Sequence, residues 1–127
     1  MQVELERSAV LLLGWGRIAI GVQEMVAPGL LLRLVSKGTP PDPTAVALFR
    51  GFGARDAVVG AGVVWADQSG DAATRARWFA SAAACDVADF VAMVAGRRLH
   101  PTTRALTATM AGGAAALGVI AALRARA

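Results

Sequence analysis

Four long apolar segments divide the chain, and the last of them carries no charge from end to end. They cover residues 8–32, 44–66, 78–96 and 105–123. A helix that crosses a membrane needs about 20 mostly apolar residues, and each segment is close to that length or longer. The sequence therefore predicts an all-α integral membrane bundle of four antiparallel transmembrane helices, formed by a single domain over residues 1–127.

Composition excludes several other classes of protein. Hydrophobic residues make up 56% of the chain and charged residues 17%, whereas soluble domains carry about 25% charged residues. The single cysteine, Cys85, leaves no partner for a disulfide within the chain. No histidine or cysteine grouping has the spacing of a metal site, and no glycine motif follows a strand. We therefore expect no metal and no cofactor.

The net charge of +4 comes from arginines beside the apolar segments. They are not clustered on one polar element, as they are in nucleic-acid-binding proteins, so we expect no nucleic acid partner. Arginines at the ends of apolar helices bind lipid headgroups, which makes membrane lipid the expected partner. Basic residues divide five against five between the two sides of the bundle, so the sequence does not set its orientation.

Turn residues mark where the predicted helices begin and end. Asp42 is placed to cap the second helix, with Pro43 at its first position. Asp71 is a candidate cap for the third helix, and Gly96 is placed to end it. Pro28 lacks a backbone N–H, so we expect it to bend or end the first helix. A signal peptide begins with a positively charged flank, and the residues before this helix do not form one. We therefore expect the first helix to be retained. The predicted location is a bacterial inner membrane.

Seven ionisable residues lie inside the apolar segments. Each costs about 2.5–3.5 kcal/mol at the centre of a membrane helix if it is unpaired. They must therefore face inward, pair with one another, lose their charge or reach the membrane surface. They are Arg17 and Glu24 in the first segment, Arg50, Arg55 and Asp56 in the second, and Asp86 and Asp89 in the third.

The rise of about 1.5 Å per helical residue places these charges at two depths. A midplane layer holds Arg17, Arg55, Asp56 and Asp86, and an offset layer holds Glu24, Arg50 and Asp89. The total is three positive and four negative charges. This near-balance favours an ion-pair network, with the extra acid available to carry a proton.

Helical periodicity also gives the charges faces. In the first helix, Arg17 and Glu24 share a stripe with glycines, and small residues let helices approach closely in a membrane. In the second, Arg50 shares a similar glycine stripe, whereas Arg55 points to the other side and is expected to face a second chain or a headgroup cavity. Asp86 and Asp89 lie on one face of the third helix.

Three stretches together resemble a known kind of protein. They are residues 16–21 (GRIAIG) with Ala27-Pro28, residues 49–56 (FRGFGARD) with Gly60, and residues 85–89 (CDVAD). The chain is similar, over nearly its whole length, to the small four-span membrane proteins of high-GC bacteria. Those families carry a G-x-R-D element in the second helix and an acidic third helix, and most have no known function. The resemblance implies membrane residence and a four-helix bundle, and it transfers no activity.

Several functions remain open. The first is a small integral membrane protein of unknown molecular activity, in which the Arg/Asp/Glu network holds the helices in register. Such a protein would be an accessory or oligomer-forming component, as a homo-oligomer or with another membrane protein. The alternative is a membrane-embedded acid–base enzyme that acts on a lipophilic small molecule. A proton- or ion-coupled transport element is a third reading, which needs an oligomer.

Each reading assigns roles to the same charges. Asp86 and Asp89 are candidate catalytic acids, and Arg17 and Arg50 are candidates for stabilising an anion. Asp56 and Glu24 are further catalytic candidates. Arg55 is a candidate substrate-binding residue. A network that is only structural should leave no space beside Asp86. A functional pocket should be a cavity of about 300 Å³ or more, lined by these acids.

Overall fold

The computed structural model describes residues 2–35, 40, 42–97 and 100–126, and over these residues the chain folds into helices alone. The all-α prediction is therefore confirmed. The first long helix is built from α1 (Gln2–Ala9), the π-helical η1 (Val10–Gly16) and α2 (Arg17–Val26). After it come α3 (Pro28–Val35), α4 (Pro43–Ser69), α5 (Ala72–Ala95) and α6 (Pro101–Arg124).

Within the part of the chain that the structure describes, three helices are long and apolar enough to cross a membrane. They span Arg7–Val26, Ala72–Ala95 and Pro101–Arg124. The 27-residue α4 is longer than any of them, but every stretch of 18 residues within it carries at least three charges. Length and composition thus support a membrane protein with three spanning helices, and the predicted fourth span needs a separate argument.

The predicted first helix over residues 8–32 is wrong at both ends. It begins earlier, at Gln2, and it ends at Val26. Ala27 leaves the helical conformation, with φ −135° and ψ 57°. Because a proline has no N–H to continue a helix, Pro28 starts α3 instead. The break expected at Pro28 is present, and residues 28–35 form a helix of their own.

The other three helices begin before the predicted segments, because the residues that cap their first turns lie outside the apolar runs. Asp71 caps α5 by accepting a hydrogen bond from the Thr74 backbone nitrogen at 2.9 Å, as predicted. Pro43 is the first residue of α4, but the side chain of Asp42 makes no capping hydrogen bond. Gly70 ends α4 with a φ of 70°, a conformation that a side chain disfavours.

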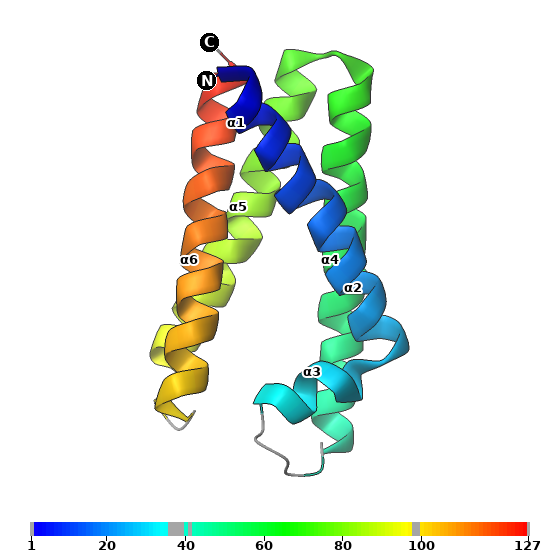
Figure 1. The fold of residues 1–127 in the computed structure, drawn as a ribbon, viewed down its shortest axis with the longest axis vertical. Helices are drawn as coiled ribbons and strands as arrows, with labels where there is room; N and C mark the ends of the chain where they lie inside the picture. The colour runs from blue at the N-terminus through cyan, green and yellow to red at the C-terminus, as the bar shows by residue number, and fades with distance from the viewer. Residues whose placement is uncertain (1, 36–39, 41, 98–99, 127) are drawn as a thin grey trace.

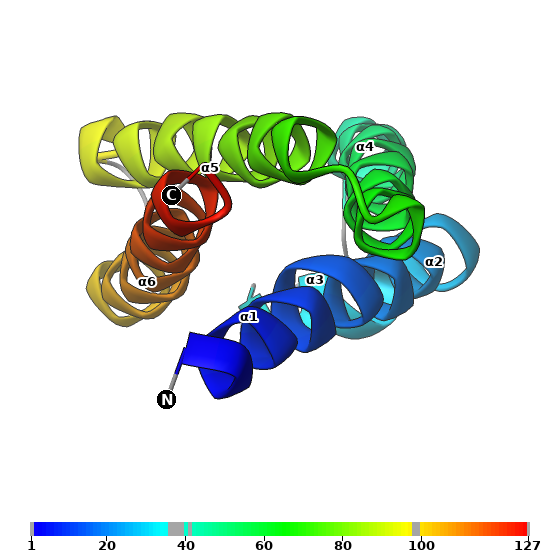
Figure 2. The same cartoon turned by 90° about the horizontal axis from the view of Figure 1, so that it is seen from above.

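The helices form two pairs, because α2 packs along α4 and α5 packs along α6 (Figures 1 and 2). The two chain ends and the α4–α5 turn lie together at one end of the molecule, here called the termini end (Figure 1). At that end a core of small and apolar side chains joins the pairs. Its members are Ala9, Leu13, Val63, Phe79, Ala82, Ala121 and Ala122. The opposite end, which holds α3, is here called the α3 end.

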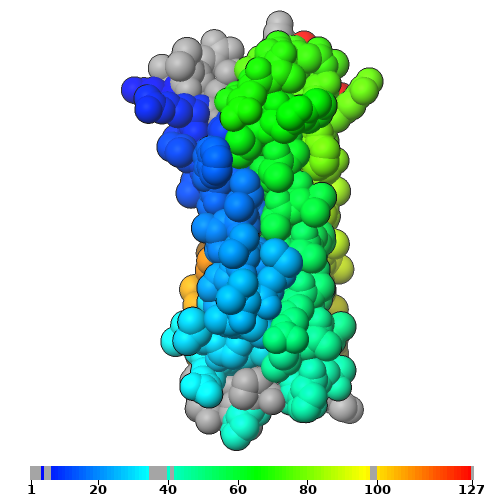
Figure 3. Space-filling model, turned by 90° about the vertical axis from the view of Figure 1, so that its right-hand side faces the viewer, coloured from blue at the N-terminus to red at the C-terminus, as the bar shows by residue number. Residues whose placement is uncertain are grey.

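Glycines allow α2 and α4 to touch through their backbones, and the two helices lie side by side in Figure 3. A Cβ atom built on Gly21 would lie 2.5 Å from the Gly53 carbonyl oxygen, and one built on Gly60 would lie 2.6 Å from the Gly14 carbonyl oxygen. The glycine stripes predicted for these helices therefore face each other. This close contact fixes the side chains of Arg17 and Glu24, which share the α2 stripe, beside α4.

Candidate functional site

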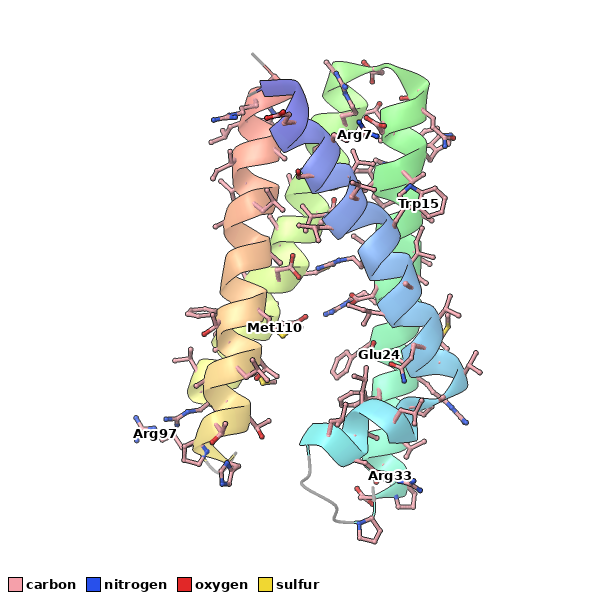
Figure 4. The ribbon with its side chains drawn as sticks, in the orientation of Figure 1. Arg7, Trp15, Glu24, Arg33, Arg97 and Met110 are labelled. Carbon is pink, nitrogen blue, oxygen red and sulfur yellow. The ribbon has the colours of Figure 1, made fainter. Side chains whose placement is uncertain are left out.

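A cavity of about 370 Å³ lies between the two helix pairs. Side chains from η1, α2, α4, α5 and α6 line it, and in Figure 4 Glu24 and Met110 approach it from opposite sides. Six of the seven predicted intramembrane charges line this cavity: Arg17, Glu24, Arg55, Asp56, Asp86 and Asp89. The cavity lies beside Asp86, and its volume is within the range of ligand pockets.

Arg17 links α2 to both neighbouring helices. Its Nη2 donates to Oδ1 of Asp86 on α5, and its Nη1 lies 3.6 Å from Oδ1 of Asp56 on α4. The side chains of Arg17 and Asp86 are only 7% and 6% exposed. Breaking a pair buried to this degree leaves an uncompensated charge, which typically costs about 3–5 kcal/mol. Arg17 is therefore a structural centre of the site as well as part of its wall.

Arg55 forms the second half of the network. It donates two parallel hydrogen bonds to Asp89, from Nη1 to Oδ1 at 3.0 Å and from Nη2 to Oδ2 at 2.7 Å. It also donates from Nε to Oδ1 of Asp56 at 3.1 Å. Such two-pronged arginine–carboxylate pairs are among the strongest polar contacts in proteins. The guanidinium lies 5.5 Å from the centre of the Phe52 ring as well.

These contacts form one continuous chain of charges across three helices, in the order Asp86, Arg17, Asp56, Arg55 and Asp89. Side-chain exposure rises along it, from 6% at Asp86 to 16% at Asp56, 30% at Arg55 and 37% at Asp89. The chain thus begins at a buried carboxylate, Asp86, and ends at a more exposed one, Asp89.

Glu24 lines the same cavity but stands outside this chain of charges. Among the described residues, no ion pair joins it to Arg17 or Arg55. Its Oε2 atom is buried without a hydrogen-bond partner, and so are Oδ2 of Asp86 and Nη1 of Arg17. A buried polar atom without a partner costs about 1–3 kcal/mol. Three such atoms therefore lie on cavity-lining residues, where the protein itself leaves hydrogen-bonding capacity unused.

Arg50 is the one predicted site residue that the structure leaves out. It was expected to lie at the same depth as Glu24, but its side chain is exposed and does not line the cavity. Gly53, one helical turn further along α4, already lies opposite Met25, near the end of α2. Because α2 stops at Val26, no part of that helix stands beside Arg50.

Two other predictions about these charges are wrong. Arg55 does not face away from the bundle, because its long side chain turns into the cavity and pairs with Asp89. The two predicted layers are therefore not separate, since Asp89 of the offset layer binds Arg55 of the midplane layer. A helical wheel gives the direction of Cβ only, whereas an arginine head group can lie well to the side of it.

The apolar part of the site was not predicted from the sequence. Phe49 and Phe52 line the cavity from α4, Met93 from α5, and Met110 and Thr107 from α6. Helical spacing contained the signal, because Phe49 and Phe52 lie seven and four residues before Asp56, and Met93 lies four residues after Asp89. The π-helical turn of η1, immediately before Arg17, was not predicted either. Such turns often occur next to functional residues.

No metal site accompanies these carboxylates in the part of the chain that is described, where no group of three or more histidine, cysteine, aspartate or glutamate side chains could hold an ion. No protein-family model, curated protein or solved structure matches this chain. The resemblance to four-span membrane proteins therefore remains a prediction, and any function has to be argued from the cavity.

Proposed function

We propose that the chain is a small integral membrane protein in which four helical spans enclose a binding pocket for a lipophilic small molecule. The observation that carries the proposal is the cavity of about 370 Å³, which combines apolar walls with buried polar atoms that lack partners. Ligand pockets have about 300–1,000 Å³ and mostly apolar walls with a few convergent polar groups. This cavity has both properties.

The fourth span in this proposal is α4. Its 27 residues measure about 40 Å at 1.5 Å per residue, which exceeds the roughly 30 Å of a bilayer core. Two of its charges, Arg55 and Asp56, are paired inside the cavity. The others, Arg50 and Asp67, lie toward its two ends, where charged side chains can reach the headgroups. The charge content of α4 is therefore compatible with spanning.

Single cysteines on either side of α4 test this topology. In a Cys85→Ala background, Asp42→Cys and Ser69→Cys flank α4, and Arg97→Cys marks the far end of α5. With four spans, a membrane-impermeant maleimide added to sealed vesicles labels Ser69→Cys from one side, and Asp42→Cys and Arg97→Cys from the other. Labelling of Asp42→Cys and Ser69→Cys from the same side would show that α4 does not cross. Cell fractionation tests the predicted location in a bacterial inner membrane. Crosslinking tests the predicted homo-oligomer.

The four methionines allow a direct test of the pocket. Met93 and Met110 line the cavity, whereas Met25 does not. In protein labelled with ¹³C at the methionine methyl groups and held in lipid nanodiscs, we expect a small lipophilic probe to shift the Met93 and Met110 signals and to leave Met25 unchanged. A suitable panel is benzyltrimethylammonium, benzylsulfonate and neutral neopentylbenzene. If none of the three moves Met93 or Met110, the cavity is not a binding pocket.

Acid–base catalysis on the bound molecule is the second candidate function. It is favoured by the unpartnered oxygens of Glu24 and Asp86, because two carboxyl groups that can act as an acid or a base line one cavity. Incubation of nanodiscs with a lipid extract, followed by mass spectrometry, tests it. A product formed by the natural protein and by neither Glu24→Gln nor Asp86→Asn supports catalysis. A product formed equally by all three excludes these residues as catalysts.

A further inference from the structure

The charges that line the cavity are unequal in number. Four carboxylates, those of Glu24, Asp56, Asp86 and Asp89, face two guanidinium groups, those of Arg17 and Arg55. Both guanidinium groups are already held by aspartates. A ligand that enters the cavity therefore finds carboxylate oxygens in excess over free cationic donors.

The unpartnered atoms show the same imbalance. Oε2 of Glu24 and Oδ2 of Asp86 are buried acceptors without a donor. The one unpartnered donor on this wall, Nη1 of Arg17, lies 3.6 Å from Asp56 and is already neutralised by it. The side chain of Asp86 is only 6% exposed. Its free oxygen is therefore reachable only from within the protein. The wall is therefore built to accept hydrogen bonds or to balance a positive charge.

The apolar part of the wall suits a cation with a hydrophobic body. Phe49 and Phe52 form an edge-to-face pair with ring centres 6.3 Å apart, and aromatic faces attract cations. Phe52 already does so, with the Arg55 guanidinium 5.5 Å from its centre. Met93 and Met110 line the cavity too, and methionine adapts its shape to varied apolar groups.

Resting on the proposed pocket, we propose that its ligand is a lipophilic organic cation, an amine or quaternary ammonium compound whose charge lies against Glu24. The aromatic and methionine side chains then cover the apolar body of the ligand. An anion of the same shape is disfavoured, because it meets the surplus carboxylates while both arginines are engaged.

Three probes of nearly equal shape separate the charge of the ligand from its apolar body. Benzyltrimethylammonium is a cation, neopentylbenzene replaces its nitrogen with carbon and is neutral, and benzylsulfonate is an anion. We expect the cation to bind at least about tenfold more tightly than the neutral probe, and the anion to bind more weakly than both. The affinities come from titrations that follow the methyl signals of Met93 and Met110.

Two variants locate the effect. Glu24→Gln keeps the size of the side chain and removes its charge, so the cation should lose its advantage while the neutral probe binds as before. Asp67→Asn removes a carboxylate at the termini end that does not line the cavity, and it should leave all three affinities unchanged. Retained binding of the neutral probe also shows that Glu24→Gln has folded.

The outcomes distinguish this inference from the proposed function. If no probe binds, the pocket itself is disproved. If the neutral probe or the anion binds as tightly as the cation, the pocket stands and the inference about its ligand is wrong. An advantage for the cation that survives in Glu24→Gln also overturns the assignment to Glu24.

Discussion

At the termini end the helices meet through small and apolar side chains, whereas toward the α3 end the same helices surround a cavity lined with charges. The core at the termini end includes Ala82 and Ala121, both fully buried, and the larger Leu13, Val63 and Phe79, each 2–3% exposed. Toward the α3 end, the space between the pairs holds Glu24, Phe49, Met93 and Met110 around the cavity (Figure 4). Close packing at one end thus allows an open, polar arrangement at the other.

This difference explains how so short a chain can hold buried charges. The two pairs are joined at the termini end by apolar contacts, so the cavity does not have to be filled for the fold to exist. The chain of charges from Asp86 to Asp89 lies where the packed core gives way to the cavity. Substitutions should therefore have opposite consequences at the two ends, and four predictions follow this contrast from the largest effect to the smallest.

Removing Arg17 should cause the greatest loss of stability. Arg17→Met leaves Asp86 and Asp56 without their shared cation, and we expect the free energy of unfolding to fall by about 3–5 kcal/mol. The loss is measured by unfolding in mixed detergent micelles, followed by circular dichroism. Arg50→Met is the matched control, because Arg50 is exposed and outside the cavity, and it should change stability by less than about 0.5 kcal/mol.

A second variant separates a lost ion pair from a lost side chain. Replacing Asp86 with leucine in the Arg17→Met background removes a carboxylate that the first substitution left unpaired, so part of the stability should return. If Arg17→Met and Arg50→Met are equally mild, the charges at the junction of the two ends do not hold the helices together.

Adding volume should be costly at the termini end and harmless in the cavity. Ala121 is completely buried in the core, and Ala111 lines the cavity from the same helix. Ala121→Leu should destabilise the protein by about 1–3 kcal/mol, because a packed core has no room for the extra atoms. Ala111→Leu should leave thermal unfolding nearly unchanged and weaken probe binding at Met93 and Met110. Equal losses of stability would mean that the two ends are packed alike.

The sequence predicted the parts of the fold that depend on local pattern. Apolar length located the long helices, and the cap at Asp71 was read directly from the turn. The stripe shared by Gly21 and Arg17 indicated which face of the first helix packs. The start of the chain was not predicted because three of residues 2–7 are charged, whereas their helix continues directly into the apolar segment that follows.

The site was less predictable because it depends on how the elements lie relative to one another. Whether Arg50 pairs with Glu24 is decided by the end of α2 at Val26, not by the depth of either residue. Whether Arg55 faces inward is decided by its long side chain and by the position of Asp89 on another helix. The cavity itself depends on the angle between two helix pairs, which no single segment encodes.

The same substitution at two glycines of α4 should have opposite signs. A Cβ atom at Gly60 would lie 2.6 Å from the Gly14 carbonyl oxygen, and neither backbone can move without separating α4 from the first helix. Gly60→Ala should therefore destabilise by about 1–3 kcal/mol. A Cβ atom at Gly51 would meet nothing within 4 Å, so Gly51→Ala should stabilise by up to about 1 kcal/mol through its higher helix propensity. A loss of stability at both positions would mean that α4 is closely packed on both faces.

The smallest effect should come from the exposed cap of α5 at the termini end. The Thr74 hydroxyl and the Thr74 backbone N–H both donate to Asp71, and they hold the pKa of its carboxyl below the ordinary value of 3.8. A carboxyl whose pKa falls on folding stabilises the folded state above its unfolded pKa, and this contribution is lost as the pH drops through the folded pKa.

Asp71→Asn keeps an acceptor oxygen but no charge. We therefore expect its melting temperature to lie slightly below that of the natural protein at pH 7, and the difference to vanish in acid below the folded pKa. Thr74→Val should raise the pKa of Asp71 toward 3.8 and move that loss to higher pH. A difference that stays constant from neutral pH into strong acid would show that Asp71 caps α5 by its shape alone, and that the termini end owes its stability to apolar packing without help from charge.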